Sequence, residues 1–246
     1  MACICAGMEN PLPTPVERPA PQDRLGHLVV RFPELLPVLH RHQLDYCCGG
    51  NVPIAQACAT AGIDLDALLT EMNAAIELGG EPVHWDERPL AELTEFIRER
   101  FHTTHRVQLP ILLEMARKVE SVHAEKPSAP HGLADALESW IPEMVQHMEK
   151  EEQVLFPMIE AGRGESAGAP VQVMEREHQD HGENLAKVRE LAHNYEPPAE
   201  ACTTWRALYS GLASFERDLM THVHLENHVL FPRALAGAPA KPREAV

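Results

Sequence analysis

Long apolar runs are missing from this 246-residue sequence, and their absence excludes one class of protein at once. A helix that crosses a membrane needs about 20 consecutive, mainly apolar residues, and no window of the sequence approaches that composition. Residues 1–7, MACICAG, also lack the basic start and the apolar stretch of a secretory signal peptide. We therefore expect a cytoplasmic protein with no membrane partner.

Basic and aromatic residues are scarce as well. The chain has 21 Lys and Arg against 37 Asp and Glu, so its formal net charge is −16, and aromatic residues make up only 5%. An acidic chain without a basic stripe is not expected to bind nucleic acid or an anionic membrane surface. The few aromatic residues offer no platform on which bases could stack. Histidine, by contrast, occurs 15 times, which points to metal chemistry.

A disulfide framework is not expected in a cytoplasmic protein. The six cysteines are therefore interpreted as thiols, metal ligands or redox groups. Cys3 and Cys5 could bind a metal, although a stray exposed pair is the simpler interpretation. Cys58 and Cys202 are expected to be packing residues in or beside helices.

Helical periodicity dominates the chain, and Pro- and Gly-rich stretches divide it. We expect an all-α protein in which a small N-terminal helical domain precedes an up-down-up-down four-helix bundle. The expected segments are a flexible Pro-rich lead (1–24), an N-terminal domain with a cysteine pair (25–80), a linker (81–89), the bundle (90–237) and a flexible tail (238–246). At the centre of the N-terminal domain lies DYCCGGN (45–51), where two thiols meet a Gly-Gly turn.

Four long helices are expected in the bundle. Short Pro- or Gly-rich loops join them, and such loops favour antiparallel neighbours. Pro110, Pro142 and Pro157 are expected to mark bends or ends of these helices. The expected ranges are about 90–122, 132–161, 170–192 and 199–236.

One eleven-residue pattern occurs twice, as HMEKEEQVLFP (147–157) and as HVHLENHVLFP (222–232). Both copies read H-x-x-x-E-x-x-V-L-F-P, and residues four apart share one face of a helix, so each copy presents an imidazole beside a carboxylate. Stepping by fours and threes places both groups on the inner face. The inner positions are Met144, His147, Glu151, Val154 and Met158 in the first copy, and Phe215, Leu219, His222, Glu226 and Val229 in the second.

A duplicated inward His/Glu pair predicts a metal site. A buried carboxylate is costly unless it is paired or bound to a metal. A lone inward histidine would more often be a satisfied core residue, but that interpretation does not explain the repeated pattern. The other two helices carry histidine pairs three residues apart, His102 with His105 and His178 with His181, and inward stepping places both members of the second pair in the core.

The number of ligands indicates more than one metal ion. Four imidazoles and two carboxylates are too many for one zinc ion, and they suit two irons bridged by both carboxylates. Ligand type alone does not distinguish iron, manganese and zinc. Ferritin-like di-iron proteins instead use mainly carboxylates with Glu-x-x-His pairs, and the repeated pattern here is of a different kind, with its glutamate four residues after the histidine.

The duplicated pattern and the D-Y-C-C-G-G turn (45–50) together resemble the repair of iron centres (RIC) family, di-iron proteins that repair iron-sulfur centres. In that family a cysteine-pair domain precedes a hemerythrin-like bundle, and the resemblance covers about residues 25–237. It implies two non-heme iron ions with oxo and carboxylate bridges. By matching position, the iron ligands would be His102, His147, Glu151, His178, His222 and Glu226, with both glutamates bridging.

The resemblance also implies roles for residues around the ligands. His105 and His181 would lie behind the ligands or serve as alternative ligands. Glu143 and Glu177 match acidic residues near the family's site and would guide iron in or out, unless they are ordinary solvated charges. His224 should face away from the core.

The function implied is that of a stress-induced, dimeric, cytoplasmic protein that restores iron-sulfur clusters damaged by nitric oxide or peroxide. Its partners would be the damaged iron-sulfur proteins, and NO or O2 would be its small-molecule ligands. One alternative is a di-iron oxidoreductase that reduces NO or peroxide itself. Another is a plain oxygen- or iron-binding hemerythrin, which would not need the cysteine domain. Whether the protein is an enzyme stays open at this point.

Cys47 and Cys48 are the remaining candidates for chemistry. Adjacent cysteines form only a strained eight-membered disulfide ring, which is easily reduced and suits redox exchange. Iron transfer to or from a client cluster is the other interpretation. The alternative without a function is a turn of small residues with inert, buried thiols.

Overall fold

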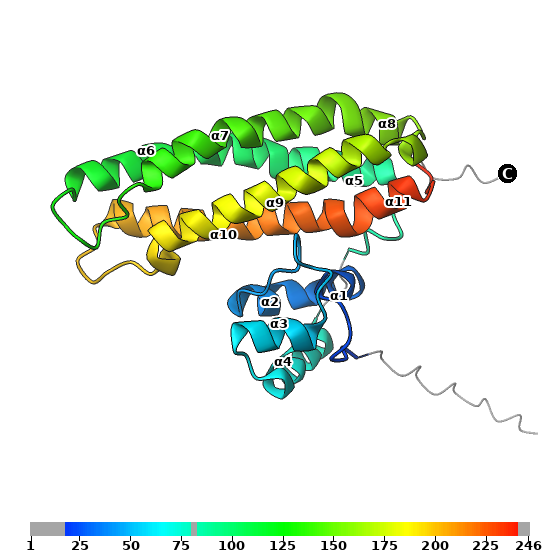
Figure 1. The fold of residues 1–246 in the computed structure, drawn as a ribbon, viewed down its shortest axis with the longest axis horizontal. Coiled ribbons are helices and arrows are strands. Elements are labelled where there is room, and N and C mark those ends of the chain that lie inside the picture. Colours follow the sequence, from blue (N-terminus) through cyan, green and yellow to red (C-terminus); the bar gives the residue numbers. More distant parts are fainter. Residues whose placement is uncertain (1–17, 80–82, 241–246) are drawn as a thin grey trace, which may run out of the picture.

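The computed structural model describes residues 18–79 and 83–240. Within these ranges the chain forms helices and no β-strand, so the all-α prediction is confirmed. Cys3 and Cys5, most of the lead (1–24) and parts of the linker and of the tail lie outside the described residues. Figure 1 shows a long helical bundle with a group of short helices packed beneath its middle.

The short helices form the N-terminal unit, which we define as residues 18–79. Asp64 caps its last helix as the sequence predicts, because the carboxylate accepts a hydrogen bond from the Ala67 N–H at 2.8 Å. The loop between the second and third helices carries the cysteine pair and meets the bundle (Figure 1). The helices are α1 (Leu25–Arg31), α2 (Leu36–Arg41), α3 (Ile54–Ala61) and α4 (Leu65–Leu78), with the 3-10 turn η1 (Pro33–Leu35) between α1 and α2.

Four long helical segments build the bundle, and three of them contain a π-helical turn. The first comprises α5 (Leu90–Ile97), the π turn η2 (Arg98–His102) and α6 (Thr103–Val122). The second comprises α7 (Leu133–Lys150), the π turn η3 (Glu151–Leu155) and α8 (Phe156–Glu160). The third is α9 (Gly168–Leu191), flanked by the 3-10 turns η4 (Gly164–Ser166) and η5 (His193–Tyr195). The fourth comprises α10 (Thr203–Leu225), the π turn η6 (Glu226–Leu230) and α11 (Phe231–Leu235).

Short connections make sequential segments antiparallel neighbours, as the sequence predicts. Helix α6 packs against α7 and α10, and α7 packs against α9 (Figure 1). No helix of the described residues is both long enough and apolar enough to cross a membrane.

Inside the bundle, a layer of buried polar residues lies between two apolar clusters. Helix α9 illustrates this, because Met174 belongs to one cluster, Leu185 belongs to the other, and the buried His178 and His181 lie between them. The cluster that contains Leu185 also includes the core of the N-terminal unit. Buried apolar surface therefore joins the unit to the bundle, and the polar layer is enclosed on both sides.

The π turn η3 changes which residues of the first motif copy face inward. Val154 and Met158 were predicted inside, but Val154 is 49% exposed, whereas Leu155 and Ile159 are buried. A π turn contains more residues than an α turn, so the inward face shifts by one position after Glu151. In the second copy Val229 is buried as predicted, at a place where α1 packs against η6.

Two of the three prolines expected at bends or ends do not end a helix. Pro110 lies inside α6 and Pro142 lies inside α7. Both prolines are on the exposed face, where water can hydrogen-bond the carbonyl that loses its N–H partner. Pro157 lies in the first turn of α8, a position that tolerates proline, directly after η3.

Candidate metal centre

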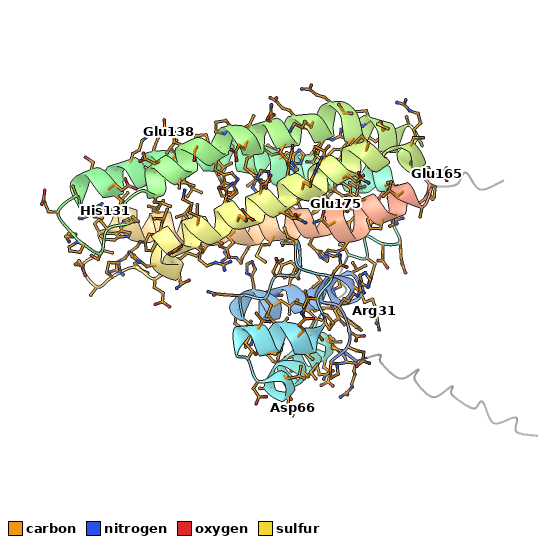
Figure 2. All side chains as sticks on the ribbon, viewed as in Figure 1. Arg31, Asp66, His131, Glu138, Glu165 and Glu175 are labelled. Carbon is orange, nitrogen blue, oxygen red and sulfur yellow. The ribbon has the colours of Figure 1, made fainter. Side chains whose placement is uncertain are left out.

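Six side chains meet in the polar layer, and all are at most 1% exposed. Each motif copy supplies one histidine and one glutamate, and the other two histidines come from η2 and α9. Figure 2 shows side chains filling the space between these segments. The six are His102, His147, Glu151, His178, His222 and Glu226, the positions singled out from the sequence.

Two groups of four potential ligands can be formed from these residues, and both groups contain Glu151 and Glu226. We call the group with His102 and His222 site A, and the group with His147 and His178 site B. Within each group, one ligand atom of each residue lies within 4.8 Å of the others. Two sets of imidazoles therefore share one pair of carboxylates.

The Nε2 atoms of the histidines face one another across this space. In site A, His102 Nε2 lies 3.1 Å from His222 Nε2, and His222 Nε2 lies 3.0 Å from Glu226 Oε1. In site B, His178 Nε2 lies 3.2 Å from His147 Nε2. Four ring nitrogens and two carboxylates therefore direct their lone pairs into one space. A cation there would interact with these atoms more favourably than they interact with one another.

Three of the four histidines are held from behind by an oxygen atom. An acceptor at Nδ1 keeps the proton on that nitrogen and leaves the Nε2 lone pair directed into the cluster, as metal-ligating histidines require. The pairs are His102 with Glu152 at 2.8 Å, His147 with Glu177 at 3.0 Å and His178 with Asn227 at 2.8 Å.

The fourth histidine, His222, has different surroundings. Its Nδ1 is buried and has no hydrogen-bond partner, and the Phe101 ring stacks on it with centroids 5.3 Å apart. Phe101 directly precedes His102, whereas Glu177 directly precedes His178 in the matching place of site B. His222 of site A therefore stacks on an aromatic ring, whereas His147 of site B bonds a carboxylate.

The hydrogen bonds of the two buried carboxylates indicate whether a cation fits among these residues. Neither oxygen of Glu151 accepts a well-aligned hydrogen bond, and Glu226 Oε2 also lacks one. The nearest nitrogens, such as His178 Nε2 at 3.1 Å from Glu226 Oε2, are at ion-pair distance but poorly aligned. A buried carboxylate without partners costs several kcal/mol, on the order estimated for desolvated ions. A cation among these atoms would offset that cost, so the residues fit a metal.

Protons compete with a cation for the same atoms. Burial disfavours charge on His102, but the carboxylates of Glu151 and Glu152 beside its ring raise its pKa to about 9. Burial likewise opposes the charge of His178, and the nearby Glu226 carboxylate raises its pKa to about 9. Metal ligands must be deprotonated, so binding would release protons from these two imidazoles at neutral pH.

His105 and His181 are buried next to the cluster but belong to neither site. His181 Nδ1 accepts a hydrogen bond from the Trp140 indole N–H at 3.0 Å, which orients the ring edge-on against His147. Neither ring nitrogen of His105 has a partner, and its ring lies 5.1 Å from that of Phe215. Burial lowers the pKa of both histidines, so both are neutral.

A polar cleft of about 380 Å³ opens beside site B. Glu143, Lys150, Glu177 and His181 are among its lining residues. Glu177 connects the cleft to the cluster, because its carboxylate bonds both His147 and Lys150. The hydrogen bond with His147 lowers the pKa of Glu177 to about 2, so this carboxylate carries a negative charge at neutral pH.

The cysteine turn lies against the other flank of α9. Asp45 organises the turn, because its carboxylate accepts hydrogen bonds from the N–H groups of Cys47, Cys48 and Gly49 at 2.9–3.0 Å. The two sulfurs are 3.8 Å apart, and the Cys48 thiol donates to the His178 carbonyl at 3.1 Å. The Cys47–Cys48 contact and burial raise the pKa of Cys47, while the same contact lowers the pKa of Cys48.

His224 and His228, the two histidines of the second motif copy that have no counterpart in the first, contact the N-terminal unit. His224 is expected to face away from the core, yet it is buried, because the N-terminal unit packs on it and its Nδ1 lies 3.3 Å from the Tyr46 carbonyl. His228 Nε2 donates to the Cys47 carbonyl at 2.9 Å. Gly50 permits this fit, since a Cβ there would lie 2.5 Å from His228 Nε2 and 2.4 Å from the Tyr46 oxygen.

The other two cysteines differ from each other. Cys58 is buried in α3, which agrees with the packing role expected of it. Cys202 is exposed at the start of α10, and its Sγ lies 3.3 Å from His123 Nε2. The packing interpretation is therefore wrong for Cys202, because the residue at this helix start points to solvent.

Sequence reasoning missed Glu152 and Asn227, although the family resemblance did single out Glu177. Glu152 and Asn227 occupy the same place in the two motif copies, directly after the glutamate, and each bonds a histidine of a neighbouring helix. The recurrence of a polar residue at this place was an available signal. Phe101 and Trp140 left no signal, because their contacts depend on the register between helices.

Comparisons with known proteins agree with this geometry. Residues 96–234 match the hemerythrin HHE cation binding domain, and residues 21–76 match a domain of unknown function, DUF542. The iron-sulfur cluster repair protein YtfE of Yersinia pseudotuberculosis serotype IB (strain PB1/+) is 47% identical over 213 residues, 87% of this chain and 96% of the relative. YtfE of Yersinia pestis (strain Pestoides F) shows the same identity and coverage.

The hemerythrin match and the buried His/Glu cluster agree on a non-heme iron site. The high identity extends over the N-terminal unit as well as the bundle, so the resemblance drawn from the sequence is confirmed. The chain therefore belongs to the family of the iron-sulfur cluster repair protein YtfE.

Proposed function

We propose that this protein holds two iron ions in the bundle and repairs damaged iron-sulfur clusters by supplying iron. One observation carries the proposal, namely that sites A and B share Glu151 and Glu226. Two sets of imidazoles around a common pair of carboxylates suit two ions with both carboxylates as bridges. The repair function follows from the relatives, which are named iron-sulfur cluster repair proteins.

Each ion would be held by two histidines and by one oxygen of each bridging carboxylate. His102 and His222 would hold one ion, and His147 and His178 would hold the other. The group held by these residues would supply ferrous iron for transfer and could take up a small ligand such as NO or O2. A nitrogen and oxygen donor set should hold ferrous iron less tightly than a thiolate site would.

The protein groups around the ligands support binding and release. Glu152, Glu177 and Asn227 keep three imidazoles in the ligating tautomer. The acidic cleft beside site B offers carboxylates at the surface, and Glu177 bonds a ligand directly. We propose that Glu143 and Glu177 attract iron on its way to or from site B.

The thiol pair would act at the other flank of α9. The Cys48 thiol contacts the backbone of a proposed ligand, and the contact with Cys47 lowers its pKa, which eases loss of the proton when the thiol reacts. We propose that Cys47 and Cys48 take part in redox exchange or iron transfer to a client. The clients are damaged iron-sulfur proteins, and a homodimer in the cytoplasm remains the expectation. The oxidoreductase alternative is not favoured, since the relatives' names describe repair.

Removing a bridging carboxylate tests the metal assignment. Glu151→Ala or Glu226→Ala should lower the iron content from about two per chain, the number inferred from the shared carboxylates, because each change removes a ligand from both ions. Iron analysis and Mössbauer spectra of the purified variants measure this. Full iron content with unchanged spectra in both variants would show that the glutamates do not bridge.

The repair function needs a separate experiment. The iron-loaded protein should reactivate an iron-sulfur enzyme that NO has inactivated, and it should do so without consuming NO at a comparable rate. Rapid turnover of NO without reactivation would instead support the oxidoreductase alternative.

A further inference from the structure

Asn227 connects the cysteine turn to one proposed iron ligand. The His178 Nδ1–H donates to Asn227 Oδ1 at 2.8 Å, and Asn227 Nδ2 donates to the Cys47 carbonyl at 3.5 Å. The same carbonyl accepts a hydrogen bond from His228 Nε2 at 2.9 Å. One amide side chain therefore contacts both the imidazole of site B and the backbone of the thiol pair.

The first motif copy shows why an amide occupies this place. Glu152 is the matching residue, and its carboxylate binds His102 and also the Arg106 guanidinium at 2.7 and 2.9 Å. A carboxylate accepts from both of these donors. At Asn227 one neighbour is a donor and the other is a carbonyl acceptor. Only a group that both accepts and donates can satisfy the two, and an amide does so.

A second contact closes a ring of interactions around His178. The Cys48 thiol donates to the His178 carbonyl at 3.1 Å, so the turn meets both the backbone and, through Asn227, the side chain of this residue. Figure 2 labels Glu175 on α9 above the N-terminal unit, and Glu175 lines a cleft of about 240 Å³ together with Cys47, Cys48 and Asn227. The turn thus lies at the wall of a small surface cleft and contacts α9 directly.

We propose that Asn227 is a positioning residue that couples the cysteine turn to the site B ligand His178. The inference rests on the proposed function, in which His178 holds an iron. With a cation on Nε2, the His178 imidazole would be more polarised and its Nδ1–H would bond Asn227 more strongly. That bond fixes the amide with its N–H groups toward the Cys47 carbonyl, so iron binding steadies the turn. By the same linkage, a disturbed turn weakens the hydrogen bond by which Asn227 orients the His178 imidazole.

Hydrogen exchange of the turn measures the coupling without an activity assay. The N–H groups of Cys47, Cys48 and Gly49 bond Asp45, so their exchange reports opening of the turn. In the full-length parent, loading with ferrous iron without oxygen should slow this exchange about fivefold, the effect of one hydrogen bond of ordinary strength. In Asn227→Asp the difference between loaded and metal-free protein should disappear, because a carboxylate still accepts from His178 but cannot donate to Cys47.

Glu152→Gln is the matched control, since it changes the same place in the other motif copy, and it should keep the parent's fivefold slowing. The coupling would be refuted if Asn227→Asp kept that slowing, or if Glu152→Gln lost it to the same degree. A reverse measurement covers the case in which Asn227→Asp binds iron poorly. Asp45→Asn loosens the turn, and when Asn227 is present it should alter the Mössbauer doublet of one iron. In an Asn227→Leu background the same substitution should leave that doublet unchanged. Equal alteration in both backgrounds would overturn the proposal.

Failure of this inference differs from failure of the proposed function. A parent protein that takes up no iron at sites A and B would refute the proposed function. A parent that binds two irons while its turn exchanges at the same rate in both states would refute the coupling alone.

Discussion

The position of each histidine along its helix determines whether its ring nitrogen can reach the proposed metal site. His102 and His178 point Nε2 at the carboxylates, whereas His105 and His181 lie one turn further along and outside both sites. We expect His102→Ala or His178→Ala to disturb the iron absorption and Mössbauer spectra strongly and to lower iron content. His105→Ala or His181→Ala should leave about two irons per chain, the inferred number, with smaller spectral changes.

The reverse order of effects would place the site one helical turn away. Circular dichroism and thermal unfolding of the four variants provide the control, because all four histidines are buried. A variant that keeps its helix content yet loses iron has lost a ligand rather than the fold.

The clustered His and Glu positions were predictable at this scale because a repeated pattern carries information that no single histidine does. Each motif copy fixes one helix face, and inward stepping along the other two helices then leaves few candidates. Glu152 and Asn227, which lie behind two of these histidines, were not predicted. Only the family resemblance placed Glu177 near the site, because its contact with His147 crosses a helix interface whose register is set by packing rather than by either sequence alone.

At the scale of elements, the π turns are the main departure from the predicted helices. Glu151 and Glu226 each begin a π turn, and His102 ends one. π turns are rare and occur mostly at functional sites, and no simple periodicity predicts them. The helices themselves were predictable because their apolar period is strong, but the extra residue moved Val154 from the interior to the surface.

A buried ion pair fastens α9 to α10 at the end remote from the cluster's π turns. Glu216 is 5% exposed, and it accepts hydrogen bonds from Arg189 and from the Tyr195 hydroxyl, the latter at 2.5 Å. Removing one partner leaves the other charge buried, so Glu216→Ala should lower the free energy of unfolding by about 3 kcal/mol. Urea titration of the metal-free protein measures the change.

An exposed ion pair serves as the control for Glu216. Arg117 contacts Glu138 between α6 and α7, and both side chains are open to solvent. Solvent screens this pair, so Glu138→Ala should leave the urea midpoint unchanged. Equal destabilisation by the two substitutions would mean that burial does not govern these pairs.

At the scale of the whole molecule, the N-terminal unit sits on the bundle through tight backbone packing. A Cβ on Gly50 would clash with the Tyr46 carbonyl and with His228, whereas a Cβ on Gly182 would meet Cys48 Sγ at an ordinary 3.6 Å. Gly50→Ala should destabilise the docking of the unit by about 1–3 kcal/mol, the usual cost of overpacking. Hydrogen exchange should then rise in α1–α4 while the bundle keeps its iron.

Gly182→Ala is the matched control at the same interface and should leave exchange in α1–α4 unchanged. Unchanged exchange in Gly50→Ala would show that the turn relaxes without loosening the unit. Sequence patterns do not predict this docking, because carbonyl acceptors and close glycine contacts carry no hydrophobic period. The two helical groups were predictable from their patterns, and their shared apolar cluster was not.

The proposed iron ligands lie in the bundle and the thiol pair lies in the N-terminal unit, so the two roles can be separated by mutation. Every proposed ligand follows Leu90, whereas Cys47 and Cys48 belong to the turn between α2 and α3, so iron assembly should not depend on the thiols. The double variant Cys47→Ser with Cys48→Ser should keep about two irons per chain, the number inferred for the parent, and their spectra. It should lose most of its ability to reactivate an NO-damaged iron-sulfur enzyme, because serine preserves the volume of the turn but not the sulfur needed for redox exchange or iron transfer. Repair at the parent's rate would make the cysteine pair structural. Loss of iron from a folded double variant would instead assign the thiols to the metal site.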